Sequence, residues 1–320
     1  MFKDIDLSGY TKITAKNMPK ESMVSEGHRA CQGCMEVMAM GMVTKVAGPE
    51  TIVCNATGCM EIITSPYPET AWKVPWIHVA FENTSAVASG VDAALEILQS
   101  KGKIKKRPNV LAFGGDGSTF DIGFQALSGA LERGHNFTYC CLDNEAYMNT
   151  GVQRSSATPF GASTTTSPAG KKSFGQNTKK KNMPLIAVAH NIPYVATASP
   201  AYPLDLMNKV QKALAIDGPA YLHIYAVCPT GWGIKGDTGI AISKLAVETN
   251  VFPLFEVVGG RFSITKEIKK PKPVLDYLKL QRRFRHLGEE QVKLIQEEVD
   301  GDYDYLQRMV AATNDPAPEA

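Results

Sequence analysis

One segment of the chain, residues 109–150, restricts its possible folds more than any other. It contains a strand-like run (NVLAF, 109–113), a glycine-rich turn (GGDGSTFDIG), a helical stretch that ends at Gly134, a second strand-like run (FTYCCL, 137–142) and a polar loop (DNEAYMNTG). A strand, a helix and a strand of about this combined length form the parallel β–α–β unit. The sequence therefore predicts an α/β fold with a mainly parallel sheet flanked by helices.

The rest of the chain supplies further elements of the same kind. We expect a helix over residues 35–46, a strand over 51–55 and a helix that begins after Asn83. Later strand and helix patterns lie at 194–198, 204–215, 220–227, 240–249, 252–264 (as a hairpin) and 291–310. These patterns indicate an N-terminal arm (1–25), a central domain (26–235) and a C-terminal extension (236–320).

Two segments carry more specific expectations. In the helix after Asn83, the face predicted to pack inward is Val87, Gly90, Val91, Ala94, Leu95 and Leu98. Residues 151–184 are rich in Ser, Thr, Gly and Lys without an apolar period, so we expect a long loop that becomes ordered against a partner rather than on its own chain. The lysine run at 179–181 is expected to be solvated.

Charge and cysteine usage exclude several classes of protein. The formal net charge of the 320 residues is +2, too small to indicate a nucleic acid or a membrane surface as partner. No stretch approaches the roughly 18 consecutive apolar residues of a spanning helix, and the first 20 residues lack the apolar core of a signal peptide. We therefore expect a cytoplasmic protein. Its seven cysteines, an odd number in a reducing compartment, are not expected to form a disulfide framework, and those that are clustered are expected to ligate a metal or a cluster.

The glycine-rich turn has the features of a diphosphate site. Gly115 and Gly117 would let the backbone approach a ligand closely, and the N–H groups at the start of the following helix favour an anion. Asp116 supplies a hard oxygen ligand for Mg²⁺. Asn144 follows Asp116 by 28 residues, after one helix and one strand, and should reach the same carboxyl edge of the sheet. This spacing is the pattern of thiamine-diphosphate binding.

The cysteines divide into two groups. Cys31 and Cys34 form a C-x-x-C pair, Cys59 follows a strand, and Cys228 ends another; together they could hold zinc or a [4Fe–4S] cluster. Ligand count alone does not separate these two possibilities. A neighbouring thiamine site favours the cluster over zinc. The thiamine adduct of a 2-oxo acid becomes electron-rich on decarboxylation, and an iron–sulfur cluster can accept its electrons one at a time. The remaining cysteines lie inside predicted strands and are expected in the core: Cys54, Cys140 and Cys141.

These residues lie in motifs that resemble the β subunit of pyruvate:ferredoxin oxidoreductases and the wider 2-oxoacid:ferredoxin oxidoreductase family. The matching segments are GHRACQGC, ATGCMEI, TAWKVPWIHVAFENTSAVASG, GGDGSTFDIGFQALSGALERGHN, DNEAYMNTGVQRSSATPFGA and IPYVATAS. The resemblance runs from about residue 24 to about residue 290. It departs from the usual pattern at Gln32 and Met35, where the relatives have small residues.

The resemblance implies a thiamine-diphosphate-binding fold and assigns roles to individual residues. Cys31, Cys34, Cys59 and Cys228 would hold the [4Fe–4S] cluster. Asp116, Asn144 and the backbone carbonyl of Ala146 would bind Mg²⁺, and Asn149 would face the thiazolium and the substrate carboxylate. The full set of expected cofactor contacts is Gly58, Gly115, Asp116, Gly117, Ser118, Asn144, Asn149 and Thr150.

The resemblance also implies partners and an activity. The chain would be one component of a complex with α, γ and δ subunits, with the α subunit supplying the glutamate for the N1′ atom of thiamine, because no motif here clearly supplies it. The complex would convert a 2-oxo acid, by default pyruvate, and coenzyme A to acyl-CoA and CO₂, and pass electrons to ferredoxin or another acceptor. Alternatives left open are an aromatic (phenylglyoxylate-like), branched-chain or oxalate substrate and, more remotely, a zinc-stapled nucleotide-binding scaffold.

Overall fold

The computed structural model describes residues 4–66 and 69–314, and over these residues the chain forms one eight-stranded sheet with the order β2-β1-β3-β4-β6-β5-β7-β8. The strands are β1 Thr51–Ala56, β2 Trp76–Val79, β3 Asn109–Gly115, β4 Thr138–Asp143, β5 Tyr194–Ala198, β6 Ala220–Tyr225, β7 Leu254–Val258 and β8 Arg261–Lys266. The first six strands in this order, β2-β1-β3-β4-β6-β5, are all parallel to their neighbours. The last two, β7 and β8, form an antiparallel hairpin, and β7 pairs antiparallel with β5. The predicted α/β fold with a mainly parallel sheet is confirmed.

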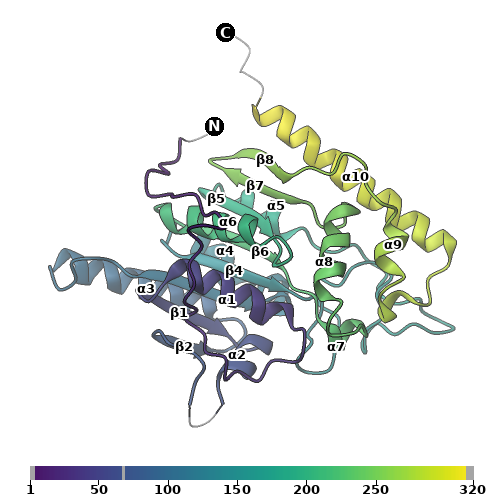
Figure 1. Ribbon diagram of the computed structural model, residues 1–320, viewed down its shortest axis with the longest axis horizontal. Coiled ribbons are helices and arrows are strands. Elements are labelled where there is room, and N and C mark those ends of the chain that lie inside the picture. The colour runs from purple at the N-terminus through teal and green to yellow at the C-terminus, as the bar shows by residue number, and fades with distance from the viewer. Residues whose placement is uncertain (1–3, 67–68, 315–320) are drawn as a thin grey trace, which may run out of the picture.

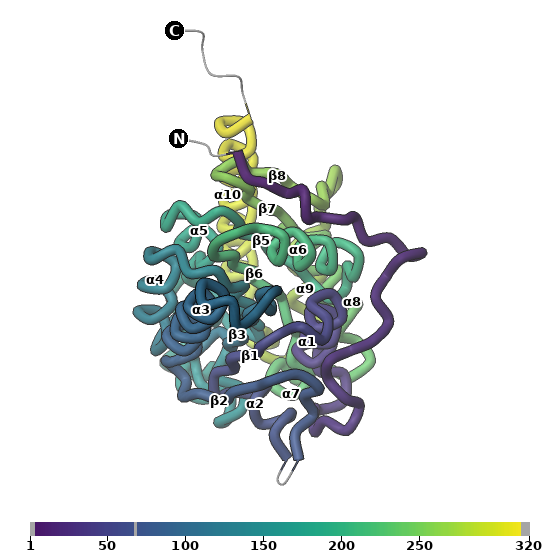
Figure 2. The backbone as a smooth tube through the Cα atoms, turned by 90° about the vertical axis from the view of Figure 1, so that its left-hand side faces the viewer, coloured from purple at the N-terminus to yellow at the C-terminus, as the bar shows by residue number. Residues whose placement is uncertain are grey.

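Helices cover both faces of the sheet. They are α1 Met35–Ala47, α2 Cys59–Thr64, α3 Thr84–Ser100, the π-helix η1 Gly117–Ile122, α4 Phe124–Glu132, α5 Met183–Val188, α6 Pro203–Ala215, α7 Pro229–Trp232, α8 Gly239–Glu248, α9 Val274–Leu278, the 3₁₀ turn η2 Arg282–Phe284 and α10 Glu289–Asn314. Figure 2 shows α3, α4 and α5 on one side of the strands and α1 and α6 on the other. Two large cores fill these layers, and a third surrounds the end of β6. Both faces are buried, as a parallel sheet requires.

The two ends of the chain lie over the sheet in different ways. The N-terminal arm crosses α6, where Tyr10 and the backbone N–H of Ile13 both donate to Asn208 Oδ1 at 2.8 Å. The long helix α10 packs against β8 and α9 (Figure 1). The C-terminal extension thus continues the same sheet and adds helices beside it; the domain boundaries proposed from sequence stay a prediction.

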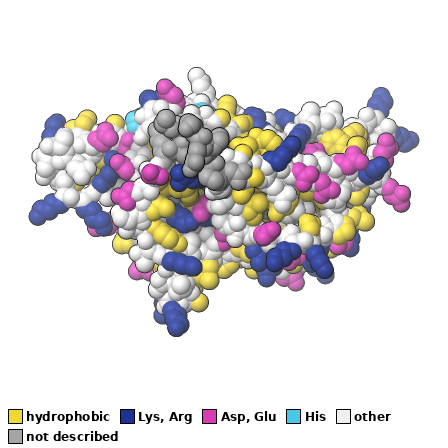
Figure 3. All heavy atoms as spheres, turned by 90° about the horizontal axis from the view of Figure 1, so that it is seen from above, with side chains coloured by type: hydrophobic (Ala, Val, Ile, Leu, Met, Phe, Trp, Pro, Cys, Tyr) yellow, Lys and Arg dark blue, Asp and Glu magenta, His cyan; other side chains and the backbone are white. Residues whose placement is uncertain are grey.

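The cysteines expected in the core lie there. Cys54, Cys140 and Cys141 are fully buried in β1 and β4. No helix among residues 4–66 and 69–314 is long and apolar enough to cross a bilayer. On the face seen from above, Figure 3 shows acidic and basic side chains interspersed.

Several expectations are wrong. The strand β2 and the helices α2 and α9 were not predicted, because each is short and lies in a segment without a clear period. In α3, Gly90 and Ala94 are exposed, and the inward face instead includes Asp92, which forms ion pairs with Arg107 and His135. A charged residue such as Asp92 is buried only because ion-pair partners elsewhere in the sequence compensate it. A search for periodic apolar residues therefore assigns it to the exposed face.

The loop after β4 also differs from expectation. It is ordered on its own chain: Ser155, Ala157, Thr158 and Ala162 are fully buried, and the backbone N–H of Ser163 donates to the Arg283 carbonyl at 2.9 Å. A dense set of turns and side-chain hydrogen bonds replaces the missing apolar period.

Candidate functional site

The predicted site residues gather at the carboxyl ends of adjacent strands. In the sheet, β1, β3, β4 and β6 are neighbours in that order, and all four run parallel. Their ends lead to Cys59, Asp116, Asn144 and Cys228. Parallel strands present their carboxyl ends at one edge, so four separate segments of the chain meet there.

The C-x-x-C segment joins this edge from the N-terminal side. The backbone N–H of Met35, which starts α1, donates to the Val227 carbonyl at 3.3 Å, just before Cys228. Gly33 has a φ of 78°, and a Cβ there would lie 2.0 Å from the Gly236 carbonyl oxygen. Only glycine allows the CQGC turn to pack this closely. The side chain of Met35 is buried in the core, and Gln32 is exposed.

The four candidate thiols influence one another electrostatically. Burial raises the pKa of Cys34 to about 12, and Glu36 and Cys228 act in the same direction. Burial also raises the pKa of Cys59 far above its usual range, assisted by Glu36, Cys228 and Cys34. These mutual effects place the thiols from three segments of the chain in one neighbourhood.

Cys228 completes this group. Burial raises its pKa to about 11, with contributions from Glu36 and Cys31, while the Gly231 N–H donates to Cys228 Sγ at 3.3 Å and opposes the shift. Across residues 4–66 and 69–314, no group of three or more His, Cys, Asp or Glu side chains is arranged to hold a single metal ion. Cys31 is exposed and the other three thiols are partly exposed, so the group lies at the protein surface.

Glu36 connects the thiols to the polar loop after β4. It is buried in the first turn of α1, and its Oε1 accepts a hydrogen bond of 2.6 Å from Asn144 Nδ2. Its Oε2 has no hydrogen-bond partner in the described part of the chain. Burial raises the pKa of Glu36 to about 8, the Asn144 hydrogen bond opposes this shift, and Asp143 adds to it. A buried carboxylate oxygen without a partner is costly, and this cost is why burial favours the neutral, protonated form of Glu36.

Asp116 lies in a buried, negatively charged environment. It is 1% exposed, and Ser155 Oγ donates to its Oδ2. Burial raises its pKa well above the usual range, and the carboxylates of Asp143 and Glu36 add to the shift, while Ser155 and Lys180 oppose it. Carboxylates gathered in this way repel each other, and a bound divalent cation would offset that repulsion.

The glycines of the turn have different surroundings. A Cβ added to Gly115 would meet no atom within 4 Å, and the same holds for Gly58. A Cβ on Gly117 would lie 2.2 Å from the Tyr147 ring, whose hydroxyl donates to the Gly117 carbonyl at 3.1 Å. Gly117 is therefore required by packing, whereas Gly58 and Gly115 leave open space at the edge of the sheet. Ser118 is buried and donates to the Phe81 carbonyl at 2.5 Å.

The loop after β4 presents two oxygens beside a strained residue. Asn144 and Ala146 are buried, and between them Glu145 has a φ of 69°, the left-handed region. Trp232 Nε1 donates to the Asn144 carbonyl at 2.9 Å, which fixes the loop from the side of α7. Asn149, further along, is exposed at the surface. Thr150 is exposed as well, and its hydroxyl donates to Gln153 Oε1 at 2.6 Å.

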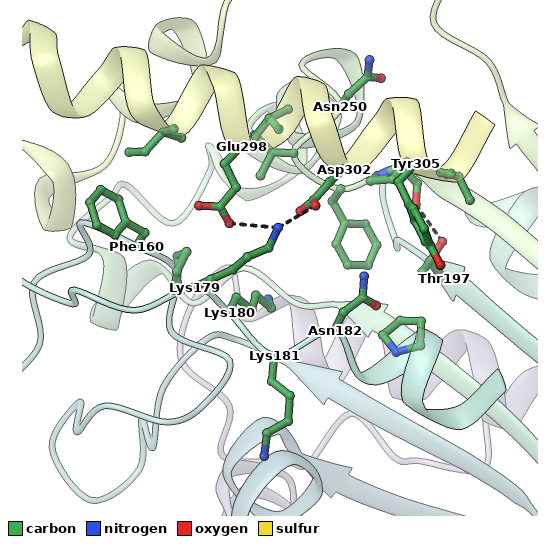
Figure 4. Close-up of a pocket in the computed structure, with 18 of the residues that line it drawn as sticks. Phe160, Lys179, Lys180, Lys181, Asn182, Thr197, Asn250, Glu298, Asp302 and Tyr305 are labelled. Carbon is green, nitrogen blue, oxygen red and sulfur yellow. Dashed lines mark hydrogen bonds and ion pairs between the residues drawn. The ribbon is translucent and has the colours of Figure 1, made fainter. Parts of the chain in front are cut away.

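A separate cavity of about 220 Å³ lies beneath α10 (Figure 4). Its lining is mainly apolar, and none of the candidate ligands lines it. Glu145 and Lys180 are among the residues that line it. The cavity is therefore behind the loop after β4 rather than part of the candidate site.

Sequence reasoning missed four residues of this site: Glu36, Lys180, Trp232 and Arg283. Glu36 follows the C-x-x-C pair by two positions, and a lone acid at a helix start is ordinarily a solvated residue near the positive end of the dipole. The expectation that the lysine run at 179–181 is solvated holds for Lys179, which is exposed, but is wrong for Lys180, whose side chain is only 23% exposed. Lys180 Nζ contacts both Asp143 and Glu145, at 2.5 and 2.8 Å.

Comparison with known proteins defines first the class and then the family. Residues 56–224 match the family described as thiamine pyrophosphate enzyme, C-terminal TPP binding domain. The chain is thus a thiamine-pyrophosphate-binding protein.

Curated relatives are similar over nearly the whole chain. A pyruvate synthase subunit PorB of Methanothermobacter thermautotrophicus is 56% identical, over 88% of this chain and 96% of that protein. The corresponding subunit of Thermotoga maritima is 47% identical, over 92% and 94%. A ketoisovalerate oxidoreductase subunit VorB of Pyrococcus abyssi is 45% identical, over 91% and 94%.

A solved structure agrees with the fold. The 2-oxoglutarate:ferredoxin oxidoreductase of Magnetococcus marinus matches with a TM-score of 0.55 and 24% identity, over 69% of this chain and 72% of that chain. The chain belongs to the β subunits of the 2-oxoacid:ferredoxin oxidoreductases, as its motifs predicted. It is therefore one subunit of an oxidoreductase complex that acts on 2-oxo acids.

Proposed function

We propose that the complex containing this chain oxidises pyruvate. Pyruvate and coenzyme A would give acetyl-CoA, CO₂, one proton and two electrons, so that mass and charge balance. The relatives named as pyruvate synthase subunits reach 56% identity, against 45% for the ketoisovalerate oxidoreductase subunit, and this difference supports pyruvate as the substrate.

Within this proposal, the residues at the strand ends hold thiamine diphosphate and Mg²⁺. Asp116, the side-chain oxygen of Asn144 and the Ala146 carbonyl are hard oxygen ligands of the kind Mg²⁺ prefers. The open space beside Gly58 and Gly115, the buried Ser118 and the start of η1 provide room and backbone donors for a diphosphate. The buried carboxylates around Asp116 support a cation at this place.

Cys31, Cys34, Cys59 and Cys228 are the proposed ligands of a [4Fe–4S] cluster. Cys₄ ligation is the usual way of holding such a cluster. The single observation that carries the proposal is the meeting of these thiols with Glu36, which bonds directly to Asn144. The thiol group and the oxygen ligands are thus neighbours, as electron transfer between two cofactors requires.

The chain's own residues have distinct roles. When bound, thiamine diphosphate would supply the carbanion chemistry for decarboxylation, and the cluster would accept electrons one at a time. Glu36 fixes the Asn144 amide by accepting a hydrogen bond from its Nδ2, and the Asn144 side-chain oxygen, which accepts from the Ala146 N–H at 3.3 Å, is the atom proposed to bind the metal. Asn149 and Thr150 lie exposed at the mouth of the site, where Asn149 can donate a hydrogen bond to the substrate carboxylate.

The remaining parts of the enzyme would come from partner subunits. We infer that an α subunit supplies the N1′ carboxylate, since the buried Glu36 is already bonded to Asn144. Subunits of the γ and δ type would carry electrons onward to ferredoxin. The cytoplasmic location expected from the sequence belongs to the same proposal.

The test is a substrate panel on the complex, co-expressed with its neighbouring subunits. Viologen reduction is followed with pyruvate, 2-oxoisovalerate, phenylglyoxylate and oxalate, each with and without coenzyme A. We expect pyruvate with coenzyme A to give the highest kcat/KM. A preference for 2-oxoisovalerate would overturn the choice of substrate, and one zinc per chain instead of about four iron and four sulfide would overturn the cluster.

A further inference from the structure

Glu145 adopts a backbone conformation that few residues with a side chain accept. Its φ of 69° places it in the left-handed region, and it lies between Asn144 and Ala146, the proposed Mg²⁺ ligands. Such a conformation persists only where surrounding contacts impose it.

The C-terminal extension provides one of these contacts. Arg283, in η2, is buried, and its Nη2 donates to Glu145 Oε2 at 2.5 Å. The same Nη2 also donates to the Tyr277 hydroxyl at 3.3 Å, and Arg283 Nε donates to Gln281 Oε1 at 2.9 Å. The pair Arg283–Glu145 is thus fixed at both ends, 138 positions apart in the sequence.

The second contact comes from the lysine run. Lys180 Nζ bridges Asp143 and the other oxygen of Glu145. Lys179 forms ion pairs with Asp302 and Glu298 of α10, at 2.6 and 3.7 Å, as Figure 4 shows. Lys181 Nζ donates to the Phe120 carbonyl in η1, the helix that Asp116 begins. Three consecutive lysines therefore connect α10, the loop after β4 and the turn after β3.

Trp232 provides an independent connection. The Arg283 guanidinium lies 3.6 Å from the centre of the Trp232 ring, and the indole N–H donates to the Asn144 carbonyl at 2.9 Å. Arg283 therefore reaches the loop twice, through the Glu145 carboxylate and through the ring that bonds Asn144. A planar guanidinium can stack and donate at once, which an ammonium group cannot.

We propose that Arg283 and Lys180 are positioning residues for the metal site: by holding the Glu145 carboxylate they keep Asn144 and Ala146 in the conformation that binds Mg²⁺. The inference rests on the proposed function. It adds that metal affinity depends on the C-terminal extension, which reaches the metal loop through Trp232 and Glu145.

The experiment measures Mg²⁺ affinity in the co-expressed complex. The complex is stripped of metal with a chelator, and Mg²⁺ is titrated calorimetrically in the presence of thiamine diphosphate, with bound Mn²⁺ followed by electron paramagnetic resonance. Substitution of a residue that supports metal ligands typically lowers affinity by about 10- to 100-fold. We expect Arg283→Met and Lys180→Met to raise the Kd for Mg²⁺ within that range.

Lys209→Met is the matched control. Lys209 is a buried cation in α6, bonded to Asp205 at 2.6 Å and to the Thr197 carbonyl at 2.8 Å, away from the metal loop. The Lys209→Met substitution should lower the midpoint temperature of thermal unfolding without changing the Kd of the complex for Mg²⁺. A folded Arg283→Met complex with unchanged Kd would overturn the inference.

Arg283→Lys decides the question if Arg283→Met does not assemble. It keeps the charge but loses the stacking on Trp232, so we expect a Kd above that of the wild type, and an unchanged Kd in both Arg283→Lys and Lys180→Met would refute the positioning role. Failure of the wild-type complex to bind Mg²⁺ at all would instead overturn the proposed function and the inference with it. The two failures are therefore distinguishable.

Discussion

Replacing Gly115 by Ala should separate cofactor binding from stability. A Cβ at this position meets no protein atom within 4 Å, and its φ lies outside the left-handed region, so alanine fits without strain. Gly→Ala at such a position stabilises a protein by about 0.4–1 kcal/mol, because it restricts the unfolded chain. The folded, cofactor-free protein should therefore be no less stable than the wild type.

The cost appears when the diphosphate binds. The new methyl group occupies the open space where the backbone is proposed to approach the phosphates, so one backbone hydrogen bond to a charged oxygen is lost. Such a bond contributes about 1.5–3 kcal/mol, which corresponds to roughly a 10- to 150-fold rise in the Kd for thiamine diphosphate. Gly117→Ala provides the contrast, since its Cβ would lie 2.2 Å from the Tyr147 ring. Overpacking of this kind costs about 1–3 kcal/mol, so this variant should lose stability as well as binding.

Two measurements on the co-expressed complex test the argument. Thermal unfolding without cofactor reports stability, and calorimetry with thiamine diphosphate and Mg²⁺ reports binding. Wild-type affinity in Gly115→Ala would show that the space beside Gly115 does not receive the diphosphate. A loss of stability in Gly115→Ala equal to that in Gly117→Ala would show that the two glycines have the same role, contrary to their surroundings.

Three further predictions concern the metal sites and the partners. Asp116→Ala should abolish Mg²⁺ and thiamine-diphosphate binding in calorimetry, because backbone donors and a helix dipole worth about 0.3–1 kcal/mol would remain alone; near-normal affinity would refute the role. Cys59→Ala should remove the visible absorption of the cluster while the buried-core control Cys54→Ala keeps it, and an intact cluster in Cys228→Ala would contradict the ligand set. The chain purified alone should show no pyruvate-dependent viologen reduction, whereas substantial turnover would mean that it carries its own N1′ carboxylate.

The elements that sequence predicted share one property: a local pattern decides them. The prediction of the buried strand β5, Tyr194–Ala198, has the observed bounds, because a run of five residues that contains aromatic and β-branched side chains is too short for a typical helix and favours a strand. The hairpin of β7 and β8 follows from Gly259 and Gly260, both with positive φ. By contrast, β2 has four residues at an edge of the sheet, and its pairing with β1 decides its conformation more than its own sequence does.

The residues of the candidate site also fall into two groups, those that a local pattern predicts and those whose position depends on distant contacts. Topology alone predicts that Asp116, Asn144 and Cys228 meet, because they follow parallel strands. The positions of Glu36 and Arg283 depend on how side chains from distant segments fill the space behind those strand ends. Both are charged residues that an isolated sequence would assign to the surface, and their burial depends on the partners Asn144 and Glu145.

The order in which the chain is synthesised gives this site a further consequence. The candidate cluster ligands extend from Cys31 to Cys228, and the contact that holds the metal loop requires Arg283. Parallel pairing between distant segments forms slowly, since long loops must close before their contacts stabilise them. A ribosome-bound chain therefore carries Cys31 and Cys34 long before their partner thiols exist. Loading of the site with its inorganic groups therefore requires synthesis to have passed Cys228 for the thiols and Arg283 for the metal loop.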